Sequence, residues 1–184
     1  MKVLGIDLSL TSTGLGIWRS GAGMILGTVR LRPPAPFRDL ARMRWICEQI
    51  GLYTEPHMEG ATLAVLEGPS YGNQGSGRQA GHHERAGLWW LVREKLDSLG
   101  VPVAVAPPAT VKKYATGSGN AGKDEVLKAA LRRNPDFDGG NDEADAMWLA
   151  AMGADHLGRA PIVPESHRAV LAKVNWPNLI GDES

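Results

Sequence analysis

The chain has 184 residues, 43% of them hydrophobic and 22% charged, and its formal net charge is zero. This length and composition are typical of one globular domain with a substantial core, and they exclude a largely disordered chain. No apolar run approaches the roughly 18 residues of a membrane span, and no signal-peptide pattern opens the chain, so we expect a cytoplasmic protein with no membrane association. The single cysteine, Cys47, excludes a disulfide framework, and its apolar surroundings predict a buried thiol.

Charge is distributed unevenly along the chain. Residues 71–133 contain ten Lys and Arg against five Asp and Glu, whereas residues 134–184 contain three against nine. A basic middle and an acidic end indicate two separate tasks, although two solvated faces would produce the same pattern.

Apolar periodicity predicts three strands at the start of the chain, followed by alternating helices and strands. The first three strands form an antiparallel meander and cover residues 2–8, 13–19 and 23–31. Two buried strands follow at 61–66 and 101–106. The expected helices cover residues 37–53, 85–99, 107–114, 124–133, 142–157 and 166–174. This order predicts an α/β fold with a mixed five-stranded sheet, three strands antiparallel and two parallel, and helices on both faces. We assign residues 1–158 to this domain and 159–184 to a C-terminal tail that packs on the domain or extends from it.

Four carboxylates lie where acid adjoins the expected core. Asp7 lies within the apolar first strand, where an unpaired charge is costly. Glu67 lies at the carboxyl end of an apolar strand, which is where open α/β sheets bind ligands. Asp142 and Asp145 have the spacing that places two side chains on one face of a helix. Taken singly, the last three would be helix-start or strand-end residues facing water, but the position of Asp7 within a strand has no such explanation.

Four converging carboxylates without cysteine predict a site for hard divalent cations. Oxygen ligands suit Mg²⁺ or Mn²⁺, and such ions bind substrate phosphates as well. A pair of ions about 3.5–4 Å apart is a common device for cleaving phosphodiester bonds. We therefore expect two ions per site.

Basic and aromatic residues between these acids suit nucleic acid. The segment 117–124 nearly matches a nucleotide-binding phosphate loop, but Asp124 replaces the required hydroxyl residue and a helix, not a strand, precedes the segment. We interpret it as a flexible loop from which Lys123 reaches a phosphate of nucleic acid. The glycine-rich loop after Glu67 carries Tyr71 and Arg78, which suit contacts with unpaired bases. Solvated lysines would explain part of this pattern equally well.

Two further motifs fit structural roles better than functional ones. The adjacent His82 and His83 would point apart on a helix, so we expect a helix start or a DNA-facing surface and not a zinc site. Trp89 and Trp90 lie in an apolar helical stretch, which favours a core or subunit-interface position over base stacking.

Four segments in order resemble the RuvC family of Holliday junction endonucleases: GIDLSLTSTGLGIW, LEGPSYG, VKKYATGSGNAGK and DEADA. The resemblance covers residues 1–155 and implies a ribonuclease H-like fold. It also implies that the four acidic metal ligands of the family correspond to Asp7, Glu67, Asp142 and Asp145. It places DNA-contacting lysines at Lys112 and Lys123, with Lys113 as a neighbour able to share the task, and a homodimer interface on the helix of Trp89 and Trp90. The family places an aromatic residue that wedges the junction centre near Tyr71, although Pro69 and Ser70 displace the ring here.

The resemblance implies an endonuclease that cuts four-way junctions symmetrically and leaves 5′-phosphate ends. Alternatives are a nuclease of the same fold with broader branched-DNA or flap substrates, a catalytically inactive junction-binding protein, and an actin-like kinase or ATPase, which would require a longer chain. No helicase-docking motif is recognisable, so no helicase partner is assigned.

Overall fold

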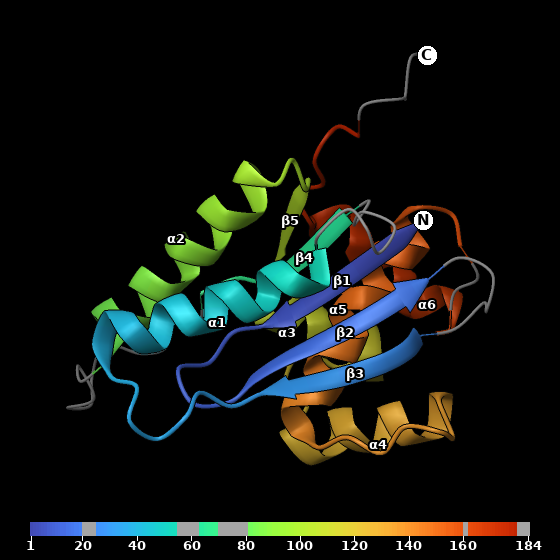
Figure 1. Ribbon diagram of the computed structural model, residues 1–184. Coiled ribbons are helices and arrows are strands. Elements are labelled where there is room, and N and C mark those ends of the chain that lie inside the picture. Colours follow the sequence, from blue (N-terminus) through green and yellow to red (C-terminus); the bar gives the residue numbers. More distant parts are fainter. Residues whose placement is uncertain (20–24, 55–62, 70–80, 160–161, 180–184) are drawn as a thin grey trace.

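The computed structural model describes residues 1–19, 25–54, 63–69, 81–159 and 162–179, and it contains a mixed sheet with helices on both faces (Figure 1). The strands are β1 (Lys2–Asp7), β2 (Thr13–Arg19), β3 (Ile25–Leu31), β4 (Leu63–Glu67) and β5 (Val103–Ala106). Their order across the sheet is β3-β2-β1-β4-β5. β1, β2 and β3 pair antiparallel, whereas β4 runs parallel to β1 and β5 parallel to β4. The predicted five-stranded mixed sheet is therefore confirmed.

The turn between β1 and β2 is held by hydroxyl groups. The Thr13 hydroxyl donates to the carbonyl oxygen of Ser9 at 2.8 Å and accepts a bond from the Ser9 backbone N–H at 3.1 Å. Short polar side chains that bond to nearby backbone in this way favour turns over continued strand. The turn brings Gly14 of β2 opposite Asp7 of β1.

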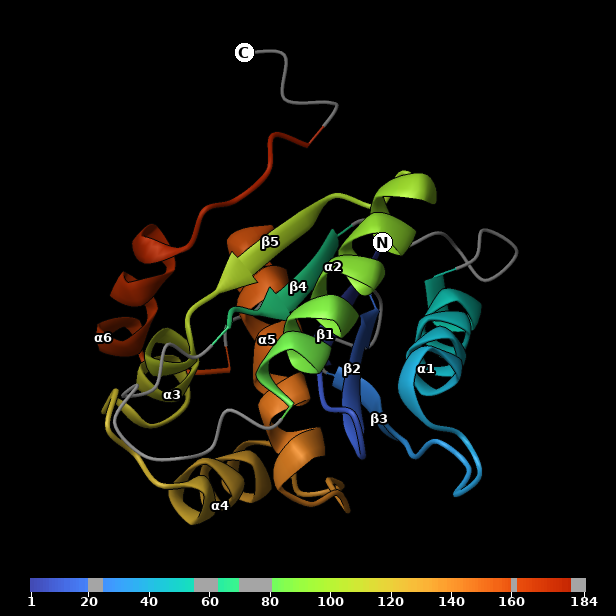
Figure 2. The same cartoon turned by 90° about the vertical axis from the view of Figure 1, so that its left-hand side faces the viewer.

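Two helices cover one face of the sheet and three cover the other (Figure 2). α1 (Asp39–Thr54) and α2 (His82–Ser98) pack on the first face. α3 (Pro108–Thr116), α4 (Lys123–Arg133) and α5 (Asn141–His156) pack on the second. The alternation of β1 separates the two cores: Leu4 and Ile6 belong to the core under α1 and α2, whereas Val3 belongs to the core under α5. No helix within the described residues has the length and apolarity needed to cross a membrane.

After α5, the chain runs along the side of the sheet that α3, α4 and α5 cover. It contains α6 (Glu165–Arg168) and the 3₁₀ helix η2 (Ala169–Lys173), both in contact with α3 (Figure 2). Val163, Val170 and Val174 are buried in the same core as α5. Asn175 forms an isolated antiparallel bridge with Val105 of β5. The division of the chain into residues 1–158 and 159–184 stays a prediction, and within the described residues this tail packs on the domain.

Several predicted boundaries were wrong for local reasons. α1 begins at Asp39 and not at residue 37, because the Phe37 N–H donates to the Pro34 carbonyl oxygen and forms a turn before the helix. β5 begins at Val103 because the Val101 N–H bonds to Leu96 at the end of α2. α2 begins at His82, three residues earlier than predicted and in agreement with the expected helix start at the two histidines.

The predicted helices near the C-terminus also differ in detail from the structure. The helix expected over 107–114 is α3 and extends to Thr116. The helix expected over 166–174 is instead α6 followed by the 3₁₀ turn η2. The first residues of the strand predicted at 23–31 lie outside the described residues. Cys47, expected to be buried, is half-buried against the core of α1, and burial raises the pKa of its thiol to about 11.

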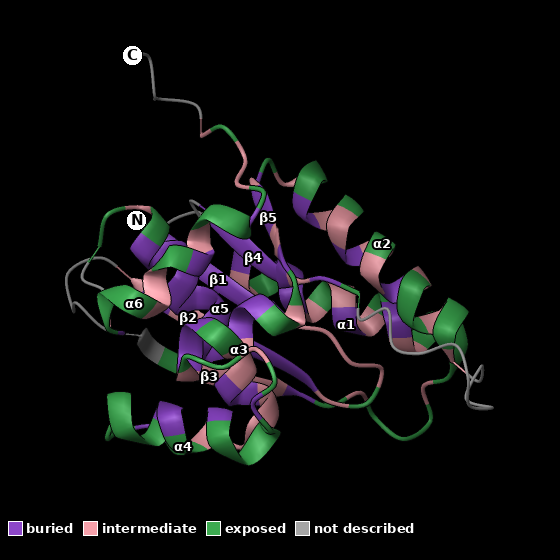
Figure 3. Cartoon of the chain, turned by 180° about the vertical axis from the view of Figure 1, so that it is seen from behind, coloured by how far each residue is buried: buried purple, intermediate pink, exposed green. Residues whose placement is uncertain are grey.

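α5 is the most deeply buried helix of the fold (Figure 3). Every residue from 146 to 155 is buried. A cross-strand pair of glycines, Gly5 and Gly16, makes room for its backbone. A Cβ atom on Gly5 or Gly16 would lie 2.1 or 2.3 Å from the Ala146 carbonyl oxygen, so any side chain there would force the helix away from the sheet. Because these two positions have no side chain, α5 lies directly on the β1–β2 hairpin.

Candidate functional site

Asp7 and Glu67 lie side by side at the carboxyl ends of two neighbouring parallel strands. The register pairs Ile6 of β1 with Leu66 of β4, and each acid is the next residue and the last of its strand. Besides burial, the charge of Glu67 raises the pKa of Asp7, so the two carboxyl groups interact directly. Both side chains are half-buried at this edge, where ligands bind in open α/β sheets.

The first turn of α5 adds the other two acids. A Cβ atom on Gly14, the partner of Asp7 in the sheet, would lie 2.1 Å from the Asp142 carbonyl oxygen. The start of α5 therefore lies against the end of the hairpin. The negative charges of Asp142 and Asp145 both act on Asp7, and that of Asp145 acts on Glu67. The structure thus brings together all four acids predicted from the sequence.

The raised pKa values of three of these acids show that ionising all four carboxylates is unfavourable. Burial raises the pKa of Asp7 to about 8, with a further contribution from the charges of Glu67, Asp145 and Asp142. Burial and Asp145 raise the pKa of Glu67 to about 7. Burial also raises the pKa of Asp145 to about 6. Without a cation, the site retains protons near neutral pH because burial and mutual repulsion disfavour the charged forms.

Two of the three predicted lysines act on this group. The positive charge of Lys123 lowers the pKa values of Asp7, Glu67 and Asp145. Lys123 is exposed at the first position of α4, and Lys112 is half-buried on α3. The charge of Lys112 lowers the pKa values of Glu67 and Asp145. The acidic group is therefore flanked by two cations from different helices.

The third lysine and two loop residues are placed differently. Lys113 is exposed on α3, and its charge is not among those that shift the pKa values of the acids. Tyr71 and Arg78, predicted to contact DNA, lie outside the described residues. The segment 117–122 joins α3 to α4, which confirms that a helix precedes it, whereas a nucleotide-binding phosphate loop follows a strand.

Ser12 is a site residue that the sequence analysis did not select. Its hydroxyl donates a 2.6 Å hydrogen bond to Oδ2 of Asp142. The two residues are 130 positions apart, and one serine among several in a turn carries no signal of such a partner. The bond restricts the Asp142 carboxylate to one orientation, as groups behind a metal ligand commonly do.

Trp89 makes a second contact that the sequence did not predict. Its indole N–H donates to the backbone carbonyl of Glu67 at 3.1 Å, which ties α2 to the end of β4. Trp89 is half-buried and meets Trp90 edge-to-face at 4.9 Å between ring centroids. Trp90 itself is 67% exposed. The core position considered for the pair is therefore wrong for Trp90, whereas the interface position stays a prediction.

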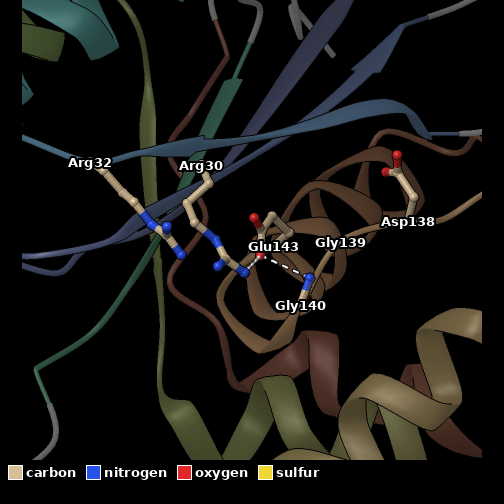
Figure 4. A pocket seen from close by; sticks show the side chains of 6 residues that line it. All are labelled: Arg30, Arg32, Asp138, Gly139, Gly140 and Glu143. Carbon is tan, nitrogen blue, oxygen red and sulfur yellow. Dashed lines mark hydrogen bonds and ion pairs between the residues drawn. The ribbon is translucent and has the colours of Figure 1, made fainter.

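Glu143 lies between Asp142 and Asp145 in the sequence, but its carboxylate pairs with Arg30 of β3. Arg30 of β3 donates to its carboxylate, and the Gly140 N–H donates to the same oxygen at 3.0 Å (Figure 4). Burial raises the pKa of Glu143, but the bonds from Arg30 and the backbone outweigh burial and lower it overall. These residues line a surface pocket with Arg32, Asp138 and Gly139. None of the four predicted acids lines this pocket.

The donor set of the four acids fits a divalent cation of the Mg²⁺ type. All its donors are carboxylate oxygens, and a cation would offset the burial and like-charge repulsion that raise the pKa values of Asp7 and Glu67. Among the described residues, no group of three or more His, Cys, Asp or Glu side chains is arranged so that it could hold a metal ion. Mg²⁺ does not require a cage of protein ligands, because it keeps several waters and binds through one or two carboxylates and substrate phosphates.

Comparisons with known proteins agree with this geometry. No family model matches the chain. A crossover junction endodeoxyribonuclease RuvC of Rhodococcus jostii is 30% identical over 182 residues, covering 94% of this chain and 89% of the relative. The RuvC of Parafrankia sp. is 30% identical over 178 residues and covers 94% and 95% of the two chains.

A solved structure shares the fold. The RuvC structure of Thermus thermophilus superposes with a TM-score of 0.65 at 21% identity, covering 88% of this chain and 99% of that one. The same protein in complex with a Holliday junction substrate superposes with a TM-score of 0.64 at 24% identity, covering 82% and 90%. The ribonuclease H-like fold implied by the motifs is thereby confirmed. With 30% identity over nearly the whole length of both chains, this chain belongs to the RuvC family of crossover junction endodeoxyribonucleases.

Proposed function

We propose that this chain hydrolyses phosphodiester bonds in four-way DNA junctions, nicking two strands symmetrically and leaving 5′-phosphate ends. The observation that carries the proposal is the convergence of four carboxylates at the ends of β1 and β4, with pKa values raised as high as about 8. Such a group is unfavourable without a cation, and divalent cations at carboxylate sites are a recurrent means of phosphodiester cleavage. The resolvases named above give the substrate class.

In this proposal the four acids would hold the cations between the sheet and α5, with Asp7 and Glu67 at the ends of β1 and β4 and Asp142 and Asp145 on the first turn of α5. Mg²⁺ or Mn²⁺, two ions per site, would lower the pKa of an attacking water and stabilise charge on the phosphate. The Ser12 hydroxyl keeps the Asp142 carboxylate oriented toward the site.

The lysines contact the DNA backbone. Lys112 and Lys123 lie close enough to the acids to shift their pKa values, so they can reach the phosphates next to the one that is cut. Lys113 is exposed beside Lys112 and contacts a more distant phosphate. Tyr71 and Arg78 contact unpaired bases at the junction centre.

A homodimer is the assembly that suits this substrate. A four-way junction offers two equivalent strands, and a two-fold dimer presents one site to each. α2 carries Trp90, whose side chain is 67% exposed, and we assign the dimer interface to this helix.

The decisive experiment incubates the protein with a synthetic four-way junction, a flap substrate and a linear duplex, in Mg²⁺ or in EDTA. Paired nicks on the junction alone that disappear in EDTA support the proposal. Equal cleavage of flaps and junctions would replace it by a broader branched-DNA nuclease. Junction binding without nicks in either Mg²⁺ or Mn²⁺ would leave only a binding protein.

A single substitution tests the metal site. Asp7→Asn removes a proposed ligand and should abolish cleavage while junction affinity is retained, because the lysine contacts persist. Asp136→Asn, at an exposed position outside the site, is the matched control and should cleave normally. Full activity of Asp7→Asn would contradict the assignment.

A further inference from the structure

An ion pair with a buried carboxylate lies at the other end of α5, away from the four acids. The side chain of Asp155 is 1% exposed and receives a two-pronged interaction from Arg168 of α6. The Arg168 Nε lies 2.9 Å from both carboxylate oxygens, and its Nη2 lies 2.6 Å from Oδ1. Such pairing fixes the relative orientation of two groups, because the planar guanidinium matches the carboxylate at two points.

A third segment joins this pair through Tyr114 of α3. The fully buried Tyr114 hydroxyl donates to Oδ2 of Asp155 at 3.1 Å. Burial and the neighbouring carboxylate raise the pKa of Tyr114, so the phenol remains the proton donor. The tyrosine ring also meets Trp148 of α5 edge-to-face at 6.1 Å between centroids. α3 is thereby attached to α5 at the same carboxylate that binds Arg168 of α6.

The residue before Arg168 holds the end of α3. Nδ1 of His167 lies 3.0 Å from the Tyr114 carbonyl oxygen, in the last turn of α3, where helix carbonyls lack intrahelical partners. The imidazole ring covers Gly117, which ends the helix with φ of 86°. A Cβ atom there would lie 2.9 Å from Nε2 of His167, so glycine is required by space as well as by conformation.

Stability alone is a weak explanation for this arrangement. Burying the Asp155 carboxylate costs desolvation free energy, and pairing with Arg168, whose side chain is 37% exposed, offsets only part of that cost. What the pair provides is a defined geometry between three segments. The segment it orients carries Lys112, two residues before Tyr114 and therefore about 200° away around the helix. A rotation of α3 about its axis would move Lys112 relative to Glu67 and Asp145.

We propose that the Asp155–Arg168 pair, with Tyr114 and His167, is a positioning device through which the segment after α5 holds α3 so that Lys112 faces the acids. The inference rests on the proposed function, since it gives Lys112 a part in the reaction. Arg168, Asp155, Tyr114 and His167 are positioning residues and touch no substrate. α6 and η2 thereby help to position a residue of the site, although its proposed metal ligands lie on other segments.

The test is a double-mutant cycle between Arg168→Ala and Lys112→Met, measured as kcat and KM on the junction. In the wild-type background Arg168→Ala should lower kcat about 10-fold with little change in KM. In the Lys112→Met background it should lower kcat less than about 2-fold, because the lysine that it positions is already absent. Equal effects in both backgrounds, or an unchanged kcat in the first, would overturn the proposal.

Two further variants keep the test decisive. If Arg168→Ala folds poorly, Arg168→Lys takes its place in the test. Arg168→Lys retains the charge but loses the two-pronged geometry, so it should show most of the kcat loss. A wild-type kcat in a folded Arg168→Lys would count against the proposal. Lys173→Ala removes an exposed charge of the same segment and is the matched control.

Hydrogen exchange separates this inference from the proposed function. Amides of residues 113–116 should exchange faster in Arg168→Ala than in wild type, whereas those of α1 should not change. This measurement needs no cleavage, so a wild-type protein that fails to cut junctions would contradict the proposed function alone. Unchanged exchange in α3 would contradict the positioning role alone.

Discussion

Gly14 lies directly against Asp142: a Cβ atom on the glycine would be 2.1 Å from the carbonyl oxygen of the aspartate. Gly14 is also the sheet partner of Asp7. The missing side chain at one position thus permits the contact between hairpin and helix that brings two acids of α5 to an acid of β1. The geometry of the proposed metal site depends on packing density as much as on its ligands.

Gly14→Ala should therefore impair both stability and cleavage. The added methyl group overlaps backbone, which cannot rotate away, and such overpacking costs about 1–3 kcal/mol. We expect a lower melting temperature and a loss of junction cleavage of about 10-fold or more, because the start of α5 must move away from Asp7. Gly27→Ala on β3 is the control, since nothing lies within 4 Å of its Cβ position. If both variants behaved alike, close packing at Gly14 would not be the cause.

The raised pKa values predict an unusual pH dependence of stability in EDTA. The native pKa values of Asp7, Glu67 and Asp145 are about 8, 7 and 6, above their values in an unfolded chain. The native protein therefore retains protons that the unfolded chain has released. Its free energy of unfolding should decrease as the pH rises from about 5 to about 8, as measured by urea denaturation.

Mg²⁺ and one substitution provide the controls for this pH dependence. Mg²⁺ should restore more stability at about pH 8 than at about pH 5, because it binds the ionised carboxylates. Asp7→Asn removes the group with the highest pKa and should flatten the profile in EDTA. A free energy of unfolding that rises between these pH values, with the same slope in both proteins, would show that the acids are ionised without metal.

Lys112 and Lys123 should influence the pH dependence of cleavage. Their charges lower the pKa values of the acids, so Lys112→Met and Lys123→Met should each raise those values. The ascending limb of the pH–rate profile should move to higher pH, with a loss of about 10–100-fold in kcat near neutral pH. Lys113 lies on the same helix as Lys112 but does not shift the pKa values of the acids. Lys113→Met should therefore leave the ascending limb at its wild-type pH. A common shift in all three variants would indicate a general charge effect on DNA binding.

Ser12→Ala should weaken metal binding without preventing it. The serine hydroxyl orients the Asp142 carboxylate at 2.6 Å, and losing such a contact typically costs about 10–100-fold in metal affinity. Titrating Mg²⁺ at saturating junction should show a higher half-maximal concentration and a nearly normal plateau. Thr11→Ala, an exposed hydroxyl of the same turn, is the control. An unchanged Mg²⁺ requirement in Ser12→Ala would mean that Asp142 needs no such support.

Local patterns in the sequence predicted most of the elements and all four acids. The apolar strands β1 and β4 and the spacing of the acids that start α5 depend on neighbours in the chain, and the structure agrees with them. Boundaries failed where a tertiary or capping contact decided them, as at Val101, whose N–H bonds to the end of α2.

The tertiary structure alone decided which of these features meet. Ser12 and Asp142 are separated by 130 positions and Arg30 and Glu143 by 113, so nothing local to either residue shows the pair. The same holds for Tyr114, Asp155 and Arg168, which lie on three helices and come together only after these helices pack on the sheet. The sequence by itself determined the strands, the helices and the chemistry of the acids, because these follow from side-chain type and period. The partners of those acids depended on strand order and close packing of helices, which arise from the fold as a whole.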